Sequence, residues 1–217
     1  MRDLRICYVG DSFVAGAGDR SGLGWVGRVG RAAMVDEERL GFVYTGYNLG
    51  VRRDTAPMVA ARFVAEVTAR LVPAQDRRVV LSFGANDTTI ENGSRRAETE
   101  ETVAALHRIH RDIHGDIHED IHRGAHRDLE GTRLFVVGPP AVDDDAHNER
   151  IGALSVVLER EAALLSVPFV PAFPVTEQDP VWRRQVREGD GAHPDAGGYE
   201  VLAELVRDPI LQWMSGG

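Results

Sequence analysis

The chain has 217 residues, of which 43% are hydrophobic and 27% are charged, and its formal net charge is −9. This length and composition are those of one globular domain, so residues 1–217 are expected to form a single domain. The negative charge argues against nucleic acid or an anionic membrane surface as a partner, and no apolar run is long enough to span a bilayer. The N-terminus shows no basic segment followed by an apolar core and a cleavage site, which predicts either a cytoplasmic protein or a sequence from which a leader is missing.

Strand-like and helix-like segments alternate along the chain. Apolar runs of strand character occupy residues 4–9, 42–49, 78–83, 132–137 and 167–170. Apolar residues at helical spacing occupy residues 22–35, 56–71, 95–129, 151–165 and the segment after Pro194. This alternation predicts parallel βαβ units and therefore an α/β fold, a three-layer α/β/α sandwich with a five-stranded parallel sheet. Residues 171–194 follow no regular pattern and are expected to be irregular.

The first strand ends at Gly10, and the polar pair Asp11 and Ser12 follows directly before small residues and a helix. Open parallel sheets bind ligands at the carboxyl ends of their strands. Ser12 would lie near a helix N-terminus, where free backbone N–H groups favour a developing anion. Taken alone, the pair is also typical of a helix N-cap.

Polar or glycine-rich residues follow the second and third strands as well, and a further polar group precedes the last helix. This last group contains Asp190 and His193. An Asp three residues before a His on one loop can hold one ring nitrogen and leave the other as a general base. Ser12 would then supply the nucleophile. The alternative is that Asp190 and His193 form an ordinary surface turn.

Three blocks together decide between these interpretations: Gly-Asp-Ser at 10–12, Gly-Ala-Asn-Asp at 84–87 and Asp-x-x-His at 190–193. In this order and at these strand ends, they resemble the SGNH (GDSL) hydrolases, from residue 4 to about residue 205. The chain contains no Gly-x-Ser-x-Gly, which disfavours the serine esterases with a nucleophile elbow. The resemblance implies a flavodoxin-like arrangement of the sheet and a serine esterase of the GDSL esterase/lipase type.

Carried over by motif, the resemblance implies that Ser12 is the nucleophile, His193 the base and Asp190 its partner. The side-chain amide of Asn86 and the backbone N–H of Ser12 would donate to the oxyanion, where fixed donors are needed as charge develops. The remaining residues of the motifs would support this site: Gly10, Asp11, Gly50, Gly84 and Asp87.

The turn after the second strand departs from the family pattern. The family usually has a glycine before the Asp-Thr pair in this block, and its N–H is a third oxyanion donor; here Arg53 precedes Asp54 and Thr55. Because a backbone N–H survives any side chain except proline, Arg53 is still expected to donate. An arginine tolerates a positive φ poorly, so we expect the local backbone to differ here. Its guanidinium, with that of Arg52, either favours an acidic group on the substrate or points to solvent.

Six of the eight histidines fall within residues 107–126, where the unit Asp-Ile-His repeats with a period of four. On a helix this spacing makes adjacent stripes of His and Ile, and two His at i and i+4 can chelate a metal. The alternative is a short duplication that lengthened a surface helix, which we favour because such tracts are assigned on composition alone. The candidate metal ligands would be His110, His114, His118 and His122. His147 follows an acidic run and is expected to be solvated.

The leading hypothesis is a serine esterase that cleaves small or short-acyl carboxylic esters through an acyl-enzyme, without a cofactor. Its partner would be a small-molecule ester. Carbohydrate O-acetyl groups, thioesters and lysophospholipids remain open as substrates, and residues 172–189 are expected to wall the site. A second hypothesis, from a different class, is a non-catalytic metal-binding protein that uses residues 107–126.

Overall fold

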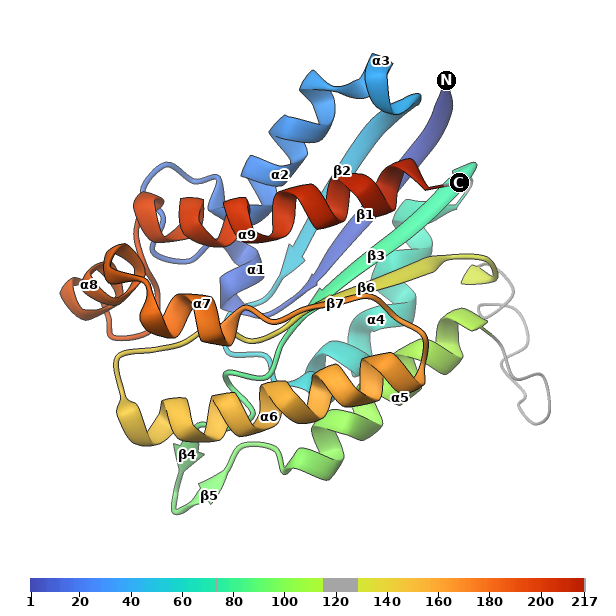
Figure 1. Ribbon diagram of the computed structural model, residues 1–217. Helices are drawn as coiled ribbons and strands as arrows, with labels where there is room; N and C mark the ends of the chain where they lie inside the picture. The colour runs from blue at the N-terminus through green and yellow to red at the C-terminus, as the bar shows by residue number, and fades with distance from the viewer. Residues whose placement is uncertain (73, 115–128, 217) are drawn as a thin grey trace.

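A parallel sheet of five strands, in the order β2-β1-β3-β6-β7, forms the middle layer of the protein. Figure 1 shows the computed structural model, which describes residues 1–72, 74–114 and 129–216. The order of the strands is that of a flavodoxin-like doubly wound sheet, as the sequence predicted. The strands are β1 (Arg2–Gly10), β2 (Phe42–Gly50), β3 (Asp76–Ser82), β6 (Arg133–Val137) and β7 (Phe169–Val170).

Helices cover both faces of this sheet, which gives the expected three layers (Figure 1). α2 (Gly24–Val35) and α9 (Ala196–Ser215) pack against each other on one face. The other face is covered by α4 (Ala56–Leu71), α5 (Thr99–His114) and α6 (Asp145–Leu164). No helix in the described part of the chain is both long and apolar enough to cross a membrane.

The central strand β1 is buried on both faces. Ile6 and Tyr8 belong to the core beneath α2 and α9, whereas Cys7 and Val9 belong to the core beneath α4 and α5. This alternation follows from the two-residue period of a strand. It explains why β1 is a nearly continuous apolar run in the sequence.

The carboxyl ends of three neighbouring strands lie level with one another. Gly10, the last residue of β1, is aligned with Gly50 at the end of β2 and with Ser82 at the end of β3. The chain therefore leaves the sheet at the same edge after all three strands. Because the strand order reverses between β1 and β3, this edge is the switch point at which such sheets bind ligands.

Residues 171–194 are not irregular, so that prediction is wrong. They contain α7 (Phe173–Gln178) and α8 (Pro180–Glu188). The carboxylate of Asp179 caps α8 by accepting the N–H groups of Val181 and Trp182, both at 2.8 Å, and Trp182 is fully buried. An N-cap Asp followed by Pro at the first helical position is a helix start signal that the sequence did contain.

The predicted helix over residues 95–129 begins too early. Ser94–Arg95 is the strand β5, which forms a hairpin with β4 (Ile90–Glu91), and α5 starts only at Thr99. The described helix ends at His114, and residues 115–128 lie outside the described residues. Two further differences concern a one-turn helix α3 (Glu37–Leu40), which was not predicted, and α6, which begins at Asp145 rather than at residue 151.

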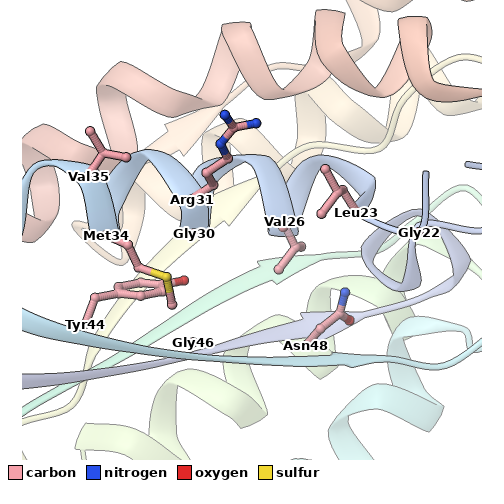
Figure 2. Close-up of a pocket in the computed structure, with 11 residues that line it drawn as sticks. Gly22, Leu23, Val26, Gly30, Arg31, Met34, Val35, Tyr44, Gly46 and Asn48 are labelled. Carbon is pink, nitrogen blue, oxygen red and sulfur yellow. The ribbon is translucent and has the colours of Figure 1, made fainter.

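A groove of about 510 Å³ lies between α2 and the edge strand β2 (Figure 2). Tyr44 of β2 lies across two glycines: a Cβ on Gly46 would come within 2.2 Å of the Tyr44 hydroxyl, and a Cβ on Gly30 within 3.1 Å. Gly30 of α2 and Gly46 of β2 thus leave room for the Tyr44 ring. Neither Ser12 nor His193 lines the groove.

At the amino ends of the strands, a fully buried arginine anchors the C-terminal helix. Arg78 of β3 donates two hydrogen bonds of 2.9 Å to the carboxylate of Asp76. Its guanidinium also donates to the carbonyl oxygens of Met214 and Gly216, both at 3.0 Å, and lies 4.8 Å from the centre of the Trp213 ring. The end of α9 is therefore held by a paired buried charge.

Candidate active site

The first strand turns into the short helix α1 (Ser12–Ala15) directly after Gly10 and Asp11. Asp11 is the N-cap of this helix, and its Oδ1 accepts the N–H of Phe13 at 2.9 Å. Ser12, the first helical residue, is 4% exposed. The capping function thus belongs to Asp11 and leaves the Ser12 hydroxyl available for another partner. Gly10 must be a glycine, because a Cβ there would lie 1.9 Å from the Ser82 carbonyl oxygen.

Ser12, His193 and Asp190 form a continuous hydrogen-bonded chain. Nε2 of His193 lies 2.7 Å from Oγ of Ser12, and Nδ1 of His193 lies 2.7 Å from Oδ2 of Asp190. The other carboxylate oxygen of Asp190 accepts the backbone N–H groups of His193 at 2.8 Å and Ala192 at 3.0 Å. With Asp190 ionised, Nδ1 carries a proton and Nε2 is left to accept the proton of Ser12.

The hydrogen bonds to Asp190 keep it ionised. Partial burial acts to raise the pKa of this carboxyl, but the hydrogen bonds from the His193 ring and from the two backbone N–H groups outweigh it and lower the pKa to about 2. A carboxylate that remains charged at neutral pH can orient the imidazole and stabilise an imidazolium.

Asn86, in the turn after β3, contacts the turn after β1 and the turn after β2. Its Nδ2 donates to the carbonyl oxygen of Asp54 at 3.0 Å and lies 3.4 Å from Oδ2 of Asp11. Gly84 begins this turn with a φ of 123°, which a side chain would rarely allow. The amide group of Asn86 therefore lies beside the turn that contains Asp11 and Ser12.

Asp87 is fully buried and caps α4 across the sheet edge. Its carboxylate accepts the N–H of Ala56 at 3.0 and 3.1 Å and the hydroxyl of Thr102 at 2.7 Å. Burial raises the pKa of this carboxyl. Thr55 is the N-cap residue of α4 by position, but its side chain makes no capping bond, so Asp87 supplies the cap from the turn after β3.

Gly50 and Asn48 fix the second strand against α1. A Cβ on Gly50 would lie 2.1 Å from the backbone nitrogen of Ala15, so only glycine lets α1 pack this closely. Asn48 accepts the N–H of Gly50 at 3.0 Å and donates to the carbonyl oxygen of Val14 at 2.7 Å, which satisfies a group at the end of α1.

Arg53 adopts the left-handed conformation, with a φ of 69°. Glycine adopts this backbone freely and an arginine adopts it at a cost, so the expectation that the backbone would differ here is wrong. Its guanidinium is 72% exposed and forms an ion pair of 3.2 Å with Glu91 of the β4–β5 hairpin. The side chain thus lies at the surface, which agrees with the second of the two alternatives for this residue.

The model of the GDSL-like lipase/acylhydrolase family matches residues 8–201. The chain belongs to this family. It is therefore an enzyme of the esterase/lipase type, whose substrates are small-molecule esters. Among curated proteins, none matches the sequence.

Several solved structures share the fold of this GDSL-family chain. The lipase/acylhydrolase of Enterococcus faecalis has 23% identity and a TM-score of 0.65, covering 97% of this chain and 96% of that one. TesA has 23% identity and a TM-score of 0.67, with 97% and 99% covered. A catalytic mutant of the acetylxylan esterase Axe2 from Geobacillus stearothermophilus has 16% identity and a TM-score of 0.70, with 100% and 96% covered.

Further residues of this GDSL-family site were not found from the sequence, because they act through tertiary contacts. The Phe13 ring lies 5.1 Å from the ring of His193. Gly18 has a φ of 88°, and a Cβ there would lie 2.9 Å from Cβ of His193. The hydroxyl of Tyr199 donates to the carbonyl oxygen of Ala17 at 2.7 Å, which ties the 16–22 loop to α9. The imidazole of His193 is thus packed by Phe13 of α1 and by the 16–22 loop.

Asp11 is completely buried beneath the site. Burial is the main cause that raises its pKa to about 7, and the neighbouring carboxylates of Asp87 and Asp54 add to it. The hydrogen bond from Phe13 acts in the opposite direction. This carboxyl therefore titrates near neutral pH, beside the Asn86 amide.

His147 is half-buried rather than solvated, so that expectation is wrong. Its Nε2 lies 3.0 Å from the carbonyl oxygen of Ala85 and 3.0 Å from the hydroxyl of Thr88, and burial lowers its pKa. Arg150 donates to the carbonyl oxygen of Thr88 at 2.9 Å. Two side chains of α6 therefore brace the turn that carries Asn86.

The described part of the histidine run does not assemble a metal site. The rings of His110 and His114 lie 4.3 Å apart, and Nε2 of His107 lies 3.0 Å from a carboxylate oxygen of Glu161. Among the described residues, no group of three or more potential metal ligands is found. The other two candidates, His118 and His122, lie outside the described residues.

Proposed function

We propose that this chain is a serine esterase that hydrolyses small or short-acyl carboxylic esters through an acyl-enzyme. Ser12 is the nucleophile, His193 the general base and Asp190 the group that orients His193. The observation that carries the proposal is the hydrogen-bonded chain Ser12–His193–Asp190, with 2.7 Å at each step. Both distances lie in the range needed for proton transfer and for nucleophile activation.

In the proposed reaction, Oγ of Ser12 attacks the ester carbonyl carbon while its proton passes to Nε2 of His193. The tetrahedral intermediate collapses when the bond to the alcohol breaks, and the alcohol leaves with the proton from His193. Water then attacks the acyl-enzyme, with His193 again taking and returning a proton, and the acid is released. Asp190 stays ionised throughout and stabilises the imidazolium.

The oxyanion of this intermediate would be held by the backbone N–H groups of Ser12 and Arg53 and by Nδ2 of Asn86. Ser12 begins α1, so its N–H has no acceptor within the helix. Asn86 uses one N–H for the Asp54 carbonyl at 3.0 Å, and its contact to Asp11 at 3.4 Å is long enough to be exchanged for the oxyanion. Each such donor contributes about 3–4 kcal/mol in the transition state.

The residues around Ser12 and His193 favour small or short-acyl esters as substrates. The side chains of Asp190 and Arg53 are 52% and 72% exposed, so the site is open to water on these sides. α8 closes another side: Trp182 stacks on Phe13 with 6.1 Å between ring centres. An acetylxylan esterase of similar fold supports an O-acetylated carbohydrate as the first alternative to a simple ester.

The test is hydrolysis of p-nitrophenyl esters from acetyl to decanoyl. We expect the highest kcat/KM for the shortest chains, and we expect Ser12→Ala to lower kcat by at least about 10³-fold. Ser215→Ala, which alters a serine at the end of α9, is the control and should retain full activity. Unchanged turnover by folded Ser12→Ala would contradict the proposed nucleophile, and a maximum at decanoyl would contradict the proposed substrate class.

A further inference from the structure

Arg62 of α4 joins two blocks of the site that are far apart in the sequence. Its Nη2 donates to the carbonyl oxygen of Gly10 at 2.9 Å, and its Nε donates to Oδ2 of Asp54 at 2.8 Å. The remaining nitrogen, Nη1, binds the carboxylate of Glu66 one turn further along α4 at 2.9 Å. All three nitrogens of the guanidinium are thus used, and its side chain is only 18% exposed.

Each of the first two acceptors is adjacent to a group that the proposed mechanism uses. Gly10 ends β1 and is separated from Ser12 only by Asp11. Asp54 follows Arg53, the proposed oxyanion donor with a positive φ, and its carbonyl oxygen accepts the amide of Asn86. The guanidinium therefore fixes the distance between the nucleophile turn and the turn that carries the other donors.

The strained backbone of Arg53 needs such support. A non-glycine residue in the left-handed region is strained and persists only where surrounding contacts hold it. On one side, the Asp54 carboxylate is bound by Arg62 at 2.8 Å; on the other, the N–H of Val51 binds Gly10 O at 2.9 Å. The carbonyl oxygen of Gly10 thus accepts hydrogen bonds from both Val51 and Arg62. These bonds hold the turn that contains Arg53 against the end of β1.

We propose that Arg62 is a positioning residue for the oxyanion hole, by virtue of its simultaneous bonds to the Gly10 carbonyl and the Asp54 carboxylate. This inference rests on the proposed function. Arg62 does not touch the substrate; it acts through Arg53 and Asn86. The planar guanidinium has separate nitrogens for the Gly10 carbonyl and the Asp54 carboxylate and binds both at once. A lysine has a single nitrogen, which reaches only one of these two acceptors, so lysine is not an adequate replacement.

The test is to measure kcat, KM and thermal stability of Arg62→Met and Arg62→Lys with p-nitrophenyl acetate. Because a misplacement of 1 Å costs about 10²-fold in rate, we expect kcat to fall about 10- to 100-fold in Arg62→Met, with KM changed less than about 3-fold. Arg62→Lys should keep the folded state and still lose about 10-fold in kcat. Arg70→Met is the matched control on the same helix, since within the described residues the Arg70 guanidinium donates to the backbone oxygen of Glu66, at 2.6 Å, and the variant should retain its activity.

A double-mutant cycle with Asn86→Ala separates positioning from a general loss of structure. If Arg62 acts through the oxyanion hole, Arg62→Met should cost markedly less in the Asn86→Ala background than in the wild type. Multiplicative losses in kcat, full activity of folded Arg62→Lys, or a loss that only follows the fraction of unfolded protein would each overturn the inference. An inactive wild-type protein would instead contradict the proposed function, which the Ser12→Ala experiment tests separately.

Discussion

Replacing Gly18 by alanine should displace His193, and the structure supplies the size of the effect. A Cβ at this position would lie 2.9 Å from Cβ of His193 and 2.8 Å from the carbonyl oxygen of Pro194. Ordinary carbon contacts begin near 3.4 Å, so the His193 backbone must move by about half an ångström. Since 1 Å costs about 10²-fold, we expect a loss of about 10-fold in kcat from this shift.

Gly18→Ala also carries a backbone cost that must be separated from the clash. The φ of Gly18 is 88°, and an alanine in this region costs about 1–2 kcal/mol, or a Tm lower by about 2–8 °C in a domain of this size. Gly22→Ala is the matched control, because the φ of Gly22 is 72° and nothing lies within 4 Å of its added Cβ.

The assay is steady-state hydrolysis of p-nitrophenyl acetate together with the Tm of both variants. Gly18→Ala should lower the Tm at least as much as Gly22→Ala, because the clash adds to the backbone cost, but only Gly18→Ala should lower kcat. Equal kcat values for the two variants would refute the conclusion that Gly18 sets the position of His193. A loss of activity in Gly22→Ala as large as that in Gly18→Ala would assign the effect to backbone strain alone.

Three further predictions concern the groups around the site and the anchor of α9. Asn86→Ala should lower kcat by about 10²- to 10³-fold with little change in KM, measured at saturating p-nitrophenyl acetate, because one oxyanion donor is lost. Burial raises the pKa of Asp11 to about 7 from an ordinary value near 3.8, so wild-type stability should fall as pH rises from about 4 to about 7. Asp11→Asn should reduce this slope in a series of Tm measurements, and an unchanged slope would show that another group causes it. Arg78→Met should destabilise the protein by about 1.5–3 kcal/mol in urea unfolding, because Asp76 loses its two hydrogen bonds from Arg78 and keeps only the ion pair with Arg2 at 3.1 Å, while kcat per folded molecule stays unchanged.

The fold was predictable because its signals are local. β1, β2, β3 and β6 are runs rich in apolar residues that end at or just before glycine or a polar residue, and the helix period returns between the strands. The two helices of residues 171–194 were missed although Asp179 and Pro180 mark the start of one of them. The hairpin β4–β5 was missed because each of its strands has only two residues, Ile90–Glu91 and Ser94–Arg95.

The candidate site divides in a similar way. Ser12, Asn86, Asp190 and His193 stand in motifs, and the strand ends that carry them could be placed on one edge of the sheet. The positive φ at Arg53 did not follow from the sequence, because the arginine led us to expect a different backbone at this turn.

The supporting contacts could not be read from the sequence, because each joins residues far apart in the chain. Gly18 packs on His193, and Arg62 binds the carbonyl oxygen of Gly10. Asp87 supplies the helix cap that Thr55 does not make. His147 of α6 binds the carbonyl oxygen of Ala85 in the turn that carries Asn86. Such contacts depend on the register of strands and the direction of helices, which no local pattern specifies.

The most direct test of the proposed chemistry is the mass of the protein after reaction with a fluorophosphonate. We expect a single adduct, located on the peptide that contains Ser12, and a rate of labelling that falls at least about 10³-fold in His193→Ala. An active protein that remains unlabelled, or that carries the adduct on a different serine, would contradict the assignment of Ser12 as the nucleophile.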